Sequence, residues 1–443
     1  MQKYLVIALV ALMPFAASSQ STSELIKQME ELMLANYIFL DKAEETNAHL
    51  DALLEKNYFD SFTDPQELAQ AVTDEMRKIT HDKHLRMNAP RIATEDDSER
   101  RDDLLQNLTR YAPPMIKEVK LLDHNVGYFD MRYFGGADKD YADVDMVMKR
   151  LLNSDAIIVD MRRNGGGSPR MAQYLTSYFF DRTLLLNRIN ERATGESREM
   201  WVLDVGGRKR PSVPVFILTS TRTFSGAEDF SYTMQQHAHR ATIVGETSGG
   251  GAHPTRYFPL EAGYGVSIPF ARTVNPVTKT NWEGVGVIPD VKCTADEAMD
   301  KAIELAVVAA KEYKESFFAP LTKKLIEVED KDFNKTDAEE IHKLLESTVD
   351  ANMLTEDDIN LAGYHYLNEG KLSAALAIFS SNTILFPASV NVYDSYAEGL
   401  AADGQNGLAL ENYEKAVALA KEQNHRDLEL YERNLNTFKD GRK

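Results

Sequence analysis

The strongest chemical signal in the sequence is a serine at the start of a predicted helix. Ser225 follows the apolar run 215–218 and a short polar turn, and the helical stretch 227–237 comes directly after it. Amide hydrogens at a helix N-terminus are unpaired and carry a positive partial charge, so they can stabilise negative charge that develops beside the serine. The small residues Gly226 and Ala227 leave room for a substrate. The alternative role for a serine in this place is a plain N-cap.

A second turn in the same region is built from three glycines. The apolar run 157–159 ends in Asp160 and leads into the triglycine segment 165–167. Glycine accepts positive φ and has no side chain, so successive amide groups can point at one anion. Neither phosphate-loop pattern, GxGxxG or GxxxxGK[ST], is present, and the segment has no lysine, which disfavours phosphate. A plain strand-to-helix turn is the alternative. The two turns together favour acyl transfer at Ser225.

A serine nucleophile needs a general base, and local pattern does not identify it here. The chain has ten histidines, and position alone leaves four candidates: His84, His237, His239 and His253. His237 and His239 lie in a polar stretch of a predicted helix, so we expect both at the surface.

Four segments, in this order, resemble the S41 family of serine peptidases. They are residues 160–167, 219–230, 245–253 and 282–290. The family includes the tail-specific C-terminal processing proteases, the tricorn core protease and the interphotoreceptor retinoid-binding protein. The resemblance covers about residues 22–310 and leaves out the rest of the chain. It implies a crotonase/ClpP-like α/β core that cleaves peptides through an acyl-enzyme.

Within this family the sequence resembles the branch that uses a histidine base. The processing proteases pair their serine with a downstream lysine, and the corresponding glycine-rich stretch has no lysine here. The tricorn-like and retinoid-binding-like branch takes a histidine from an Asp-Gly-His motif and a glutamate from near the end of the core. Asp82-Lys83-His84 matches the first of these and Glu283 the second. The resemblance therefore implies Ser225 as nucleophile, His84 as general base and acid, and Glu283 as the residue that orients the imidazole.

The same resemblance assigns an oxyanion hole to backbone amides. They would come from Gly226 and from Gly165 or Gly166. His253 is a candidate for lining the substrate cleft and is given no catalytic role. The chemistry requires no metal and no cofactor.

Two features depart from the family pattern. Lys83 replaces the small residue before the histidine, and it would lower the pKa of His84 if the two side chains approached. The stretch from His84 to Glu118, where the first core strand is predicted to begin, is too short for the PDZ domain of the processing proteases. We therefore expect no PDZ domain. The PDZ domain is the usual module for capturing a free C-terminus, so this function is expected to be absent too.

Composition limits the classes of function. Hydrophobic residues make up 43% and charged residues 27% of the 443 residues, as in a folded protein. Asp and Glu outnumber Lys and Arg by 69 to 50, and there is no basic cluster, so nucleic-acid and anionic-membrane binding are disfavoured. The single cysteine, Cys293, excludes an intramolecular disulfide and a thiolate metal cluster. Because Cys293 lies at the end of an apolar run, we expect its side chain to pack in the protein interior.

Residues 1–19 have the pattern of a secretory signal peptide. Lys3 precedes the apolar stretch 4–15, which is too short to span a bilayer, and small residues lie ahead of Gln20. Removing this segment changes the formal charge from −19 to −20. We therefore expect an exported protein, periplasmic or extracellular, with no later membrane span.

The elements that must position these groups fall into three predicted domains. An N-terminal helical domain covers residues 20–90, with apolar residues at helical spacing from Leu25 to Tyr37 and a capped helix start at Asp64-Pro65. The S41 peptidase core covers 98–315, where apolar β-rich runs alternate with helical stretches. The predicted core strands are 126–131, 156–159, 213–218, 241–244, 265–269 and 284–289, and the predicted helices are 141–152, 171–179, 227–237 and 295–312.

The C-terminal region, residues 320–443, is predicted to be all-α and carries an internal repeat. Four of its residues recur 34 positions later with similar types: Gly370, Ala375, Leu376 and Phe379 as Gly404, Ala409, Leu410 and Tyr413. That period is typical of tetratricopeptide helix pairs. Two repeats are few for a free-standing array, so we expect this region to pack on its neighbours and to offer a surface for a protein partner.

These observations lead to one main hypothesis and two alternatives. The main hypothesis is an exported serine endopeptidase acting on a peptide or protein substrate. The first alternative is a non-catalytic protein that binds an apolar ligand or peptide on the same scaffold. The second is an adaptor whose main functional element is the helical repeat.

Overall fold

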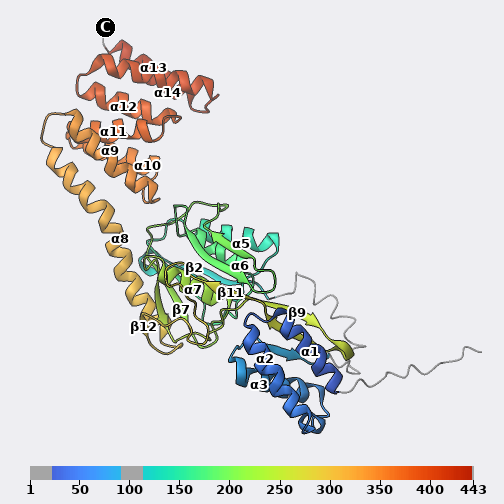
Figure 1. Cartoon of the computed structure of the whole chain (residues 1–443). Coiled ribbons are helices and arrows are strands. Elements are labelled where there is room, and N and C mark those ends of the chain that lie inside the picture. Colours follow the sequence, from blue (N-terminus) through green and yellow to red (C-terminus); the bar gives the residue numbers. More distant parts are fainter. Residues whose placement is uncertain (1–21, 91–112, 442–443) are drawn as a thin grey trace, which may run out of the picture. The chain divides into compact units, whose positions relative to one another are not determined.

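The structure is a computed structural model that describes residues 22–90 and 113–441 (Figure 1). The predicted signal peptide at 1–19 lies outside the described residues. The chain forms two compact units. Unit 1 combines the residues before 114 with 185–200 and 249–286, and unit 2 contains 114–184, 201–248 and 287–443.

Unit 1 packs three helices on a small antiparallel sheet. The helices are α1 (Thr22–Asn36), α2 (Leu40–Leu54) and α3 (Pro65–Thr80), with a short 3-10 turn, η1 (Tyr58–Ser61), before α3. The sheet has the order β1 (Arg86–Asn88), β10 (Gly265–Pro269) and β9 (Thr255–Pro259), and η4 (Glu261–Gly263) joins its last two strands. A second sheet has the order β11 (Ala271–Val274), β5 (Leu185–Glu191) and β6 (Ser197–Trp201).

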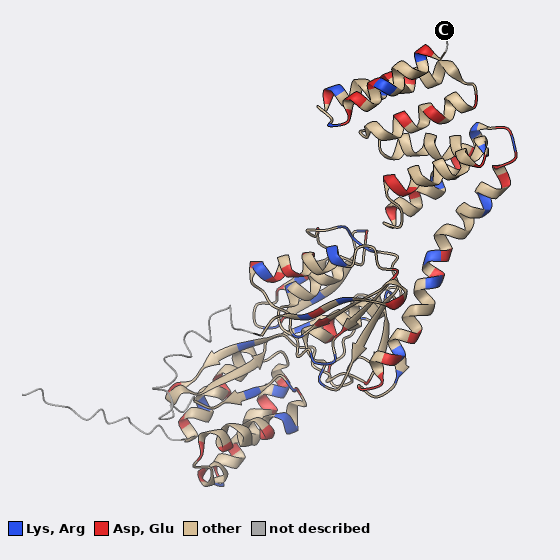
Figure 2. Ribbon diagram, turned by 180° about the vertical axis from the view of Figure 1, so that it is seen from behind, with Lys and Arg blue, Asp and Glu red and all other residues tan. Residues whose placement is uncertain are grey.

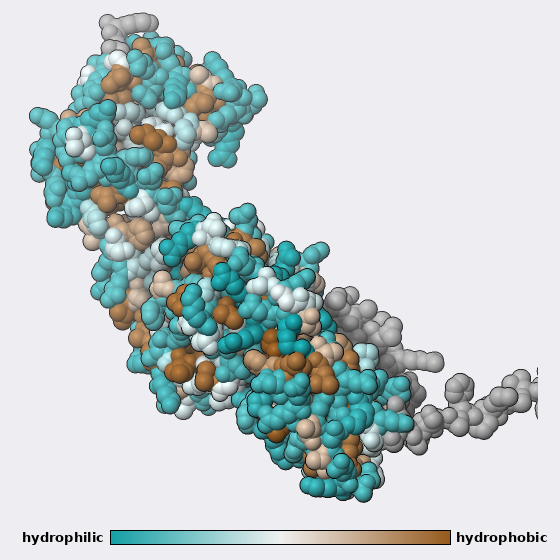
Figure 3. Space-filling view, in the orientation of Figure 1, coloured by the Kyte–Doolittle hydropathy of each residue, from teal (hydrophilic) through white to brown (hydrophobic). Residues whose placement is uncertain are grey.

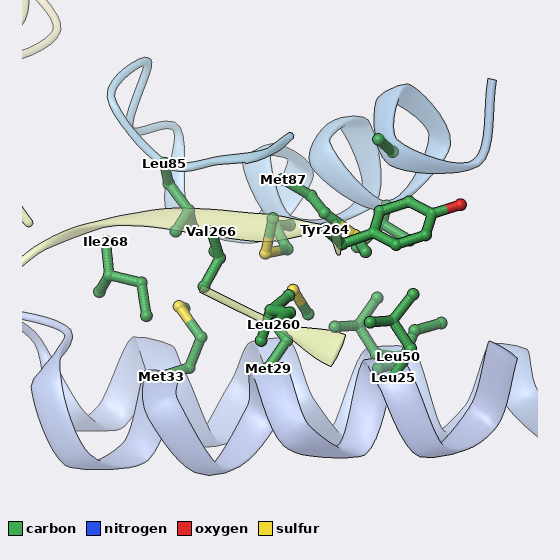
Figure 4. Close-up of a cluster of buried hydrophobic side chains, with 14 of the residues drawn as sticks. Leu25, Met29, Met33, Leu50, Leu85, Met87, Leu260, Tyr264, Val266 and Ile268 are labelled. Atoms are coloured by element: carbon green, nitrogen blue, oxygen red, sulfur yellow. The ribbon is translucent and has the colours of Figure 1, made fainter. Parts of the chain in front are cut away.

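The apolar stripe predicted on the first helix forms the core of unit 1. Met29 and Met33 of α1 are fully buried and pack with Val266 and Ile268 of β10 (Figure 4). The capped start of α3 is also confirmed, because the Asp64 carboxylate accepts hydrogen bonds from the next two free amides at 2.8 and 3.1 Å. The N-terminal region is therefore a helical layer that is completed by strands from much later in the chain.

Unit 2 contains a six-stranded sheet with the order β12-β8-β7-β4-β3-β2. Its strands are β2 (Ile116–Leu122), β3 (Val126–Met131), β4 (Ala156–Asp160), β7 (Val215–Thr219), β8 (Thr242–Gly245) and β12 (Val291–Lys292). All neighbours are parallel except β2, which lies antiparallel to β3 at one edge. Since β4 and β7 are parallel neighbours, the loops that follow them leave from the same edge of the sheet.

Four helices cover this sheet. They are α5 (Asp138–Arg150), α6 (Pro169–Ser177), α7 (Gly226–Gln236) and α8 (Ala298–Val328). Helices α5 and α7 each connect two sequential parallel strands, whereas α6 follows β4 and is separated from β7 by β5 and β6. Helix α8 buries an alanine every four residues against the strands, from Ala298 to Ala310. Cys293 is partly buried beside this cluster, as its predicted packing role requires.

The C-terminal part of unit 2 is a series of helix pairs. The helices are α9 (Lys335–Asp350), α10 (Glu356–Asn368), α11 (Leu372–Leu385), α12 (Val390–Ala402), α13 (Asn406–Glu422) and α14 (Leu428–Asp440). Helices α12 and α13 begin 34 residues after α10 and α11, which is the period of the sequence repeat. Phe379 packs against Gly363 and Gly399, where any side chain would collide with its ring.

The predicted α/β core with helical regions before and after it is confirmed, but its limits differ from those predicted. Residues 98–315 do not form one unit, because 185–200 and 249–286 supply strands that pair in unit 1. The predicted limit between residues 315 and 320 lies inside α8. The strand predicted at 284–289 is instead a turn in the structure.

Candidate active site

The serine turn lies in unit 2, between β7 and α7. Ser225 is the N-cap residue of α7 with φ 54° and ψ −118°, a conformation that is costly for any residue with a Cβ. Its side chain makes no capping hydrogen bond to the helix. The plain N-cap role weighed for this serine therefore does not describe it, and the hydroxyl is available for another purpose.

A buried carboxylate holds the backbone of Ser225. Glu228 is 0% exposed, and its Oε2 accepts the amide hydrogen of Ser225 at 2.8 Å. Its Oε1 accepts a hydrogen bond from the Ser248 hydroxyl, whose oxygen accepts the Val287 amide at 2.6 Å. Sequence reasoning missed Glu228, although the Ser-x-x-Glu spacing of a capping box was visible at the serine. This chain of bonds stabilises the strained conformation.

The triglycine turn packs directly on the serine turn. A Cβ on Gly166, which has φ +99°, would lie 2.7 Å from the amide nitrogen of Gly226 and from the Cβ of Ser225. The carbonyl of Gly166 accepts the Phe134 amide at 2.8 Å. Only glycine fits at this close approach. The two anion-ready turns singled out in the sequence are thus neighbours.

The structure separates the two oxyanion candidates of the triglycine turn. The amide of Gly166 donates to Asn164 Oδ1 at 2.9 Å, so its hydrogen is already used. Among the described residues, the amides of Gly165 and Gly226 have no such acceptor. The geometry therefore favours Gly165 over Gly166 as the partner of Gly226.

Asp229 lies one helical turn after Ser225 and is partly exposed. Its backbone amide donates to the Ser225 carbonyl at 2.9 Å. Burial raises the pKa of the Asp229 carboxyl to about 7, against a smaller lowering by a hydrogen bond from Thr233. The Asp229 carboxyl, on the helix that begins at the serine, therefore titrates near pH 7.

The histidine and the glutamate lie in unit 1, close to each other. Helix α3 ends at Thr80, and the turn that follows carries Asp82 and His84 ahead of β1. One side-chain atom each of Asp82, His84 and Glu283 lies within 4.8 Å of the others. The structure thus brings His84 and Glu283 together in unit 1, and Ser225 with the three glycines in unit 2.

Asp82 is the centre of this group and was missed as a functional residue. It is 1% exposed, and its Oδ1 accepts the backbone amide of His84 at 3.0 Å. Its Oδ2 lies 2.7 Å from Nδ1 of His253 and accepts the Tyr37 hydroxyl at 3.4 Å. Asp82, His84 and Glu283 are also of types that bind divalent metals, but the Asp82 oxygens are occupied by these protein groups.

The pKa of His84 is lowered to about 4, chiefly by burial, with smaller contributions from His253, Arg86 and Arg77 and against the opposing effect of Asp82. The imidazole is therefore neutral at pH 7, as a general base must be. Lys83 does not cause this shift, because its ammonium donates to the carbonyl of Gly249 at 2.6 Å.

The exposure of the other histidines agrees with the prediction in one case and differs from it in another. His239 is exposed, as expected. The prediction for His237 is wrong, because it is 5% exposed and its ring packs edge-on against Phe180 at the end of α7. His253 is 3% exposed and packs edge-on against Phe39. His253 is therefore an enclosed residue, like Asp82 beside it.

Comparisons with known proteins show the family of the chain. The model of peptidase family S41 matches residues 125–293, and the model of the N-terminal domain of peptidase S41 in eukaryotic IRBP matches residues 14–124. The two matches adjoin and together contain every candidate site residue. The chain belongs to peptidase family S41. The resemblance to this family that was inferred from the sequence is confirmed. The match of residues 14–124 agrees with the predicted likeness to the retinoid-binding protein.

Individual S41 relatives are distant. A carboxyl-terminal-processing protease from Synechocystis is 24% identical over 168 residues, which are 38% of this chain and 37% of that protein. A putative peptidase from Parabacteroides merdae has a TM-score of 0.48 at 19% identity, over 65% of this chain and 97% of that one. The tricorn protease has a TM-score of 0.41 at 15% identity, over 67% and 37%.

Proposed function

We propose that this S41 chain is an exported serine endopeptidase. Ser225 is the nucleophile, His84 the general base and acid, and Glu283 the residue that orients the imidazole. The observation that carries the proposal is the serine turn itself: a strained Ser225 whose hydroxyl caps nothing, held by a buried carboxylate beside unused glycine amides. A structural N-cap has no need of this strain, whereas a nucleophile presented for attack does.

The reaction follows from the groups present. Ser225 Oγ attacks the peptide carbonyl carbon, and its proton passes to the neutral imidazole of His84. The amides of Gly226 and Gly165 stabilise the oxyanion of the tetrahedral intermediate. The C–N bond then breaks as the imidazolium returns the proton to the leaving amine. Water, deprotonated by the same imidazole, hydrolyses the resulting ester and restores the serine.

Labelling with a fluorophosphonate probe tests this assignment. The probe phosphonylates an activated serine, so we expect stoichiometric modification of the wild-type chain at Ser225. The variants Ser225→Ala and His84→Ala should lose labelling and peptide cleavage while unfolding at nearly the wild-type temperature. A folded chain that binds peptides but is never labelled would instead support the non-catalytic binding protein.

Export is part of the proposal and rests on the segment 1–19. Among the described helices, none is both long and apolar enough to cross a membrane. N-terminal sequencing of the protein recovered outside the cytoplasm tests this point, and we expect the mature chain to begin at Gln20.

We further propose that the helix pairs α10–α11 and α12–α13 form a tetratricopeptide-type surface for a protein partner. The charged residues of these helices are mostly acidic: α10 begins with Glu356, Asp357 and Asp358, α12 has only acidic charges, and lysines occur on α13 (Figure 2). On the face drawn in Figure 3, hydrophobic residues form small areas surrounded by hydrophilic ones. Such a mixed surface suits recognition of a protein chain better than of nucleic acid. A pull-down tests it, with a variant that ends at Phe318, before the apolar turns of α8 that pack on α9, as the control.

A further inference from the structure

We propose that His253 is a positioning residue for the His84–Glu283 pair, an inference that rests on the proposed function. Its Nδ1 lies 2.7 Å from Asp82 Oδ2 and 3.5 Å from Glu283 Oε2. Carboxylate oxygens accept hydrogen bonds and do not donate them, so Nδ1 carries the hydrogen. This N–H group donates to Asp82 and lies beside Glu283, so it sits between the two carboxylates near the catalytic histidine.

The loop that carries His253 links the two segments that carry the catalytic groups. On one side, the carbonyl of Gly249 accepts Lys83 from the histidine turn at 2.6 Å. On the other side, the Ala252 amide donates to Glu283 Oε2 at 2.6 Å. The carbonyls of Gly250 and Gly251 accept the Gly284 amide at 3.0 Å and the Trp282 indole at 2.8 Å. His253 thus ends a loop that is bonded along its whole length to both segments.

The geometry of Asp82 explains why this link is needed. Asp82 is almost fully buried and immediately precedes Lys83 and His84 in the same turn. Without the His253 hydrogen, its Oδ2 keeps only the longer bond from Tyr37, at 3.4 Å. A buried carboxylate that loses its main partner is costly, and it would turn toward another donor. The nearest imidazole is that of His84, so Asp82 would then compete with Glu283 for it.

The enclosed position of the His253 ring supports a positioning role and not a contact with the substrate. Its ring is 3% exposed, and Phe39 packs against it edge-on with the centroids 5.5 Å apart. The charged and titratable groups that face it are Asp82, Glu283 and His84. A residue enclosed in this way acts through its neighbours and does not touch the peptide.

Two substitutions separate the hydrogen bond from the shape of the ring. In His253→Asn the side-chain amide nitrogen takes the place of Nδ1 and can still donate to Asp82. In His253→Phe the ring and its packing on Phe39 remain, but the donor is lost. We expect the rate constant for fluorophosphonate labelling of Ser225 to fall about tenfold or more in the Phe variant and to change little in the Asn variant.

A second measurement shows whether the effect passes through Glu283. If His253 positions Glu283, then His253→Phe should cost far less in a Glu283→Gln background than in the wild type. Thermal unfolding of each variant gives its folded fraction, by which the labelling rates are corrected. Equal losses in both backgrounds, or equal rates for the Phe and Asn variants, would overturn the inference.

The proposed function and this inference fail in different ways. Absence of Ser225 labelling in the wild-type chain would refute the peptidase assignment itself. Labelling of the wild type together with unchanged labelling of His253→Phe would leave the peptidase standing and remove His253 from its site.

Discussion

The two parts of the candidate site differ in the kind of group that they present and in what holds those groups in place. In unit 1, the functional groups are charged side chains fixed by one another, with Asp82 between His84 and His253. In unit 2, the groups other than the serine hydroxyl are backbone amides fixed by glycine packing and one buried carboxylate. The part proposed to move a proton thus depends on side-chain chemistry, and the part proposed to stabilise an oxyanion depends on backbone shape.

This difference predicts how each part responds to change. The serine part should tolerate no added atoms, because its two turns are in contact, and its oxyanion-hole amides do not titrate. The histidine part should tolerate small changes of shape but respond to protonation and to loss of a hydrogen-bond donor. Five experiments test the comparison.

The largest effect is expected at the glycine contact. Gly166→Ala would place a methyl group 2.7 Å from three atoms of the serine turn at φ +99°. We expect loss of Ser225 labelling by about a hundredfold or more, because the turns must move apart. Gly165→Ala is the matched control for stability, since its methyl group would meet nothing within 4 Å. Equal unfolding temperatures and equal labelling in the Gly166→Ala variant and the wild type would contradict the account.

The pH dependence should come from the histidine part. With the pKa of His84 at about 4, labelling should be constant around pH 7 and fall only well below the ordinary histidine value of about 6.5. Measurements in an Asp229→Asn background remove the group on α7 whose pKa is about 7. An inflection above pH 6.5 that persists in this background would contradict the assignment.

The same shift makes a prediction about stability. In the unfolded chain His84 binds a proton below about pH 6.5, whereas the folded chain resists protonation down to about pH 4. The unfolded state therefore holds more protons between these values, so the free energy of unfolding should fall as the pH is lowered through this window. His84→Gln should lose less stability over the same range, as measured by urea unfolding.

An intermediate effect is expected at Glu228. Glu228→Gln keeps the shape but replaces one acceptor oxygen with an NH₂ group that faces a donor, either the Ser225 amide or the Ser248 hydroxyl. We expect a loss of about 1–3 kcal/mol in the free energy of unfolding and a fall in labelling. Ser248→Ala removes the donor to Glu228 and the acceptor of the Val287 amide but leaves the Glu228 bond to the Ser225 amide, so labelling should fall less than in Glu228→Gln. Stability equal to the wild type would show that the buried carboxylate does not hold the serine turn.

The smallest effect is expected when the strain is relieved. Ser225→Gly places at φ 54° and ψ −118° the one residue that accepts this conformation freely. We expect the variant to be inactive and more stable than Ser225→Ala by about 1 kcal/mol. Chemical denaturation of the two variants makes the comparison, and a less stable glycine variant would mean that the serine turn carries no strain.

The comparison also explains how much could be read from the sequence. The serine and triglycine turns were found because each is local: an apolar strand, small residues and a helix follow one another within a few positions. Their contact followed from the parallel order of β4 and β7. The structure adds only the choice of Gly165 and the role of Glu228.

The histidine part could not be worked out from local pattern. Asp82 and His253 are 171 residues apart in sequence, and the surroundings of neither indicate that they meet. Burial of His253 and His237 was missed for the same reason, since polar neighbours along a helix or loop do not show what packs on it from elsewhere. His84 and Glu283 were reached only through resemblance to the family, and the network around them only through the structure.

Helix α8 limits how the chain can be shortened. It is one helix of 31 residues whose first half lines the sheet and whose last turns pack Leu321 and Leu325 on α9 and its neighbours. Cleavage near residue 318 would leave Leu321, Leu325 and Val328 with the helix pairs and so keep their apolar cover in place. Cleavage beyond Val328 would remove this cover from the helix pairs and expose it on the other piece. A shortened chain with no newly exposed apolar face must therefore end before Leu321.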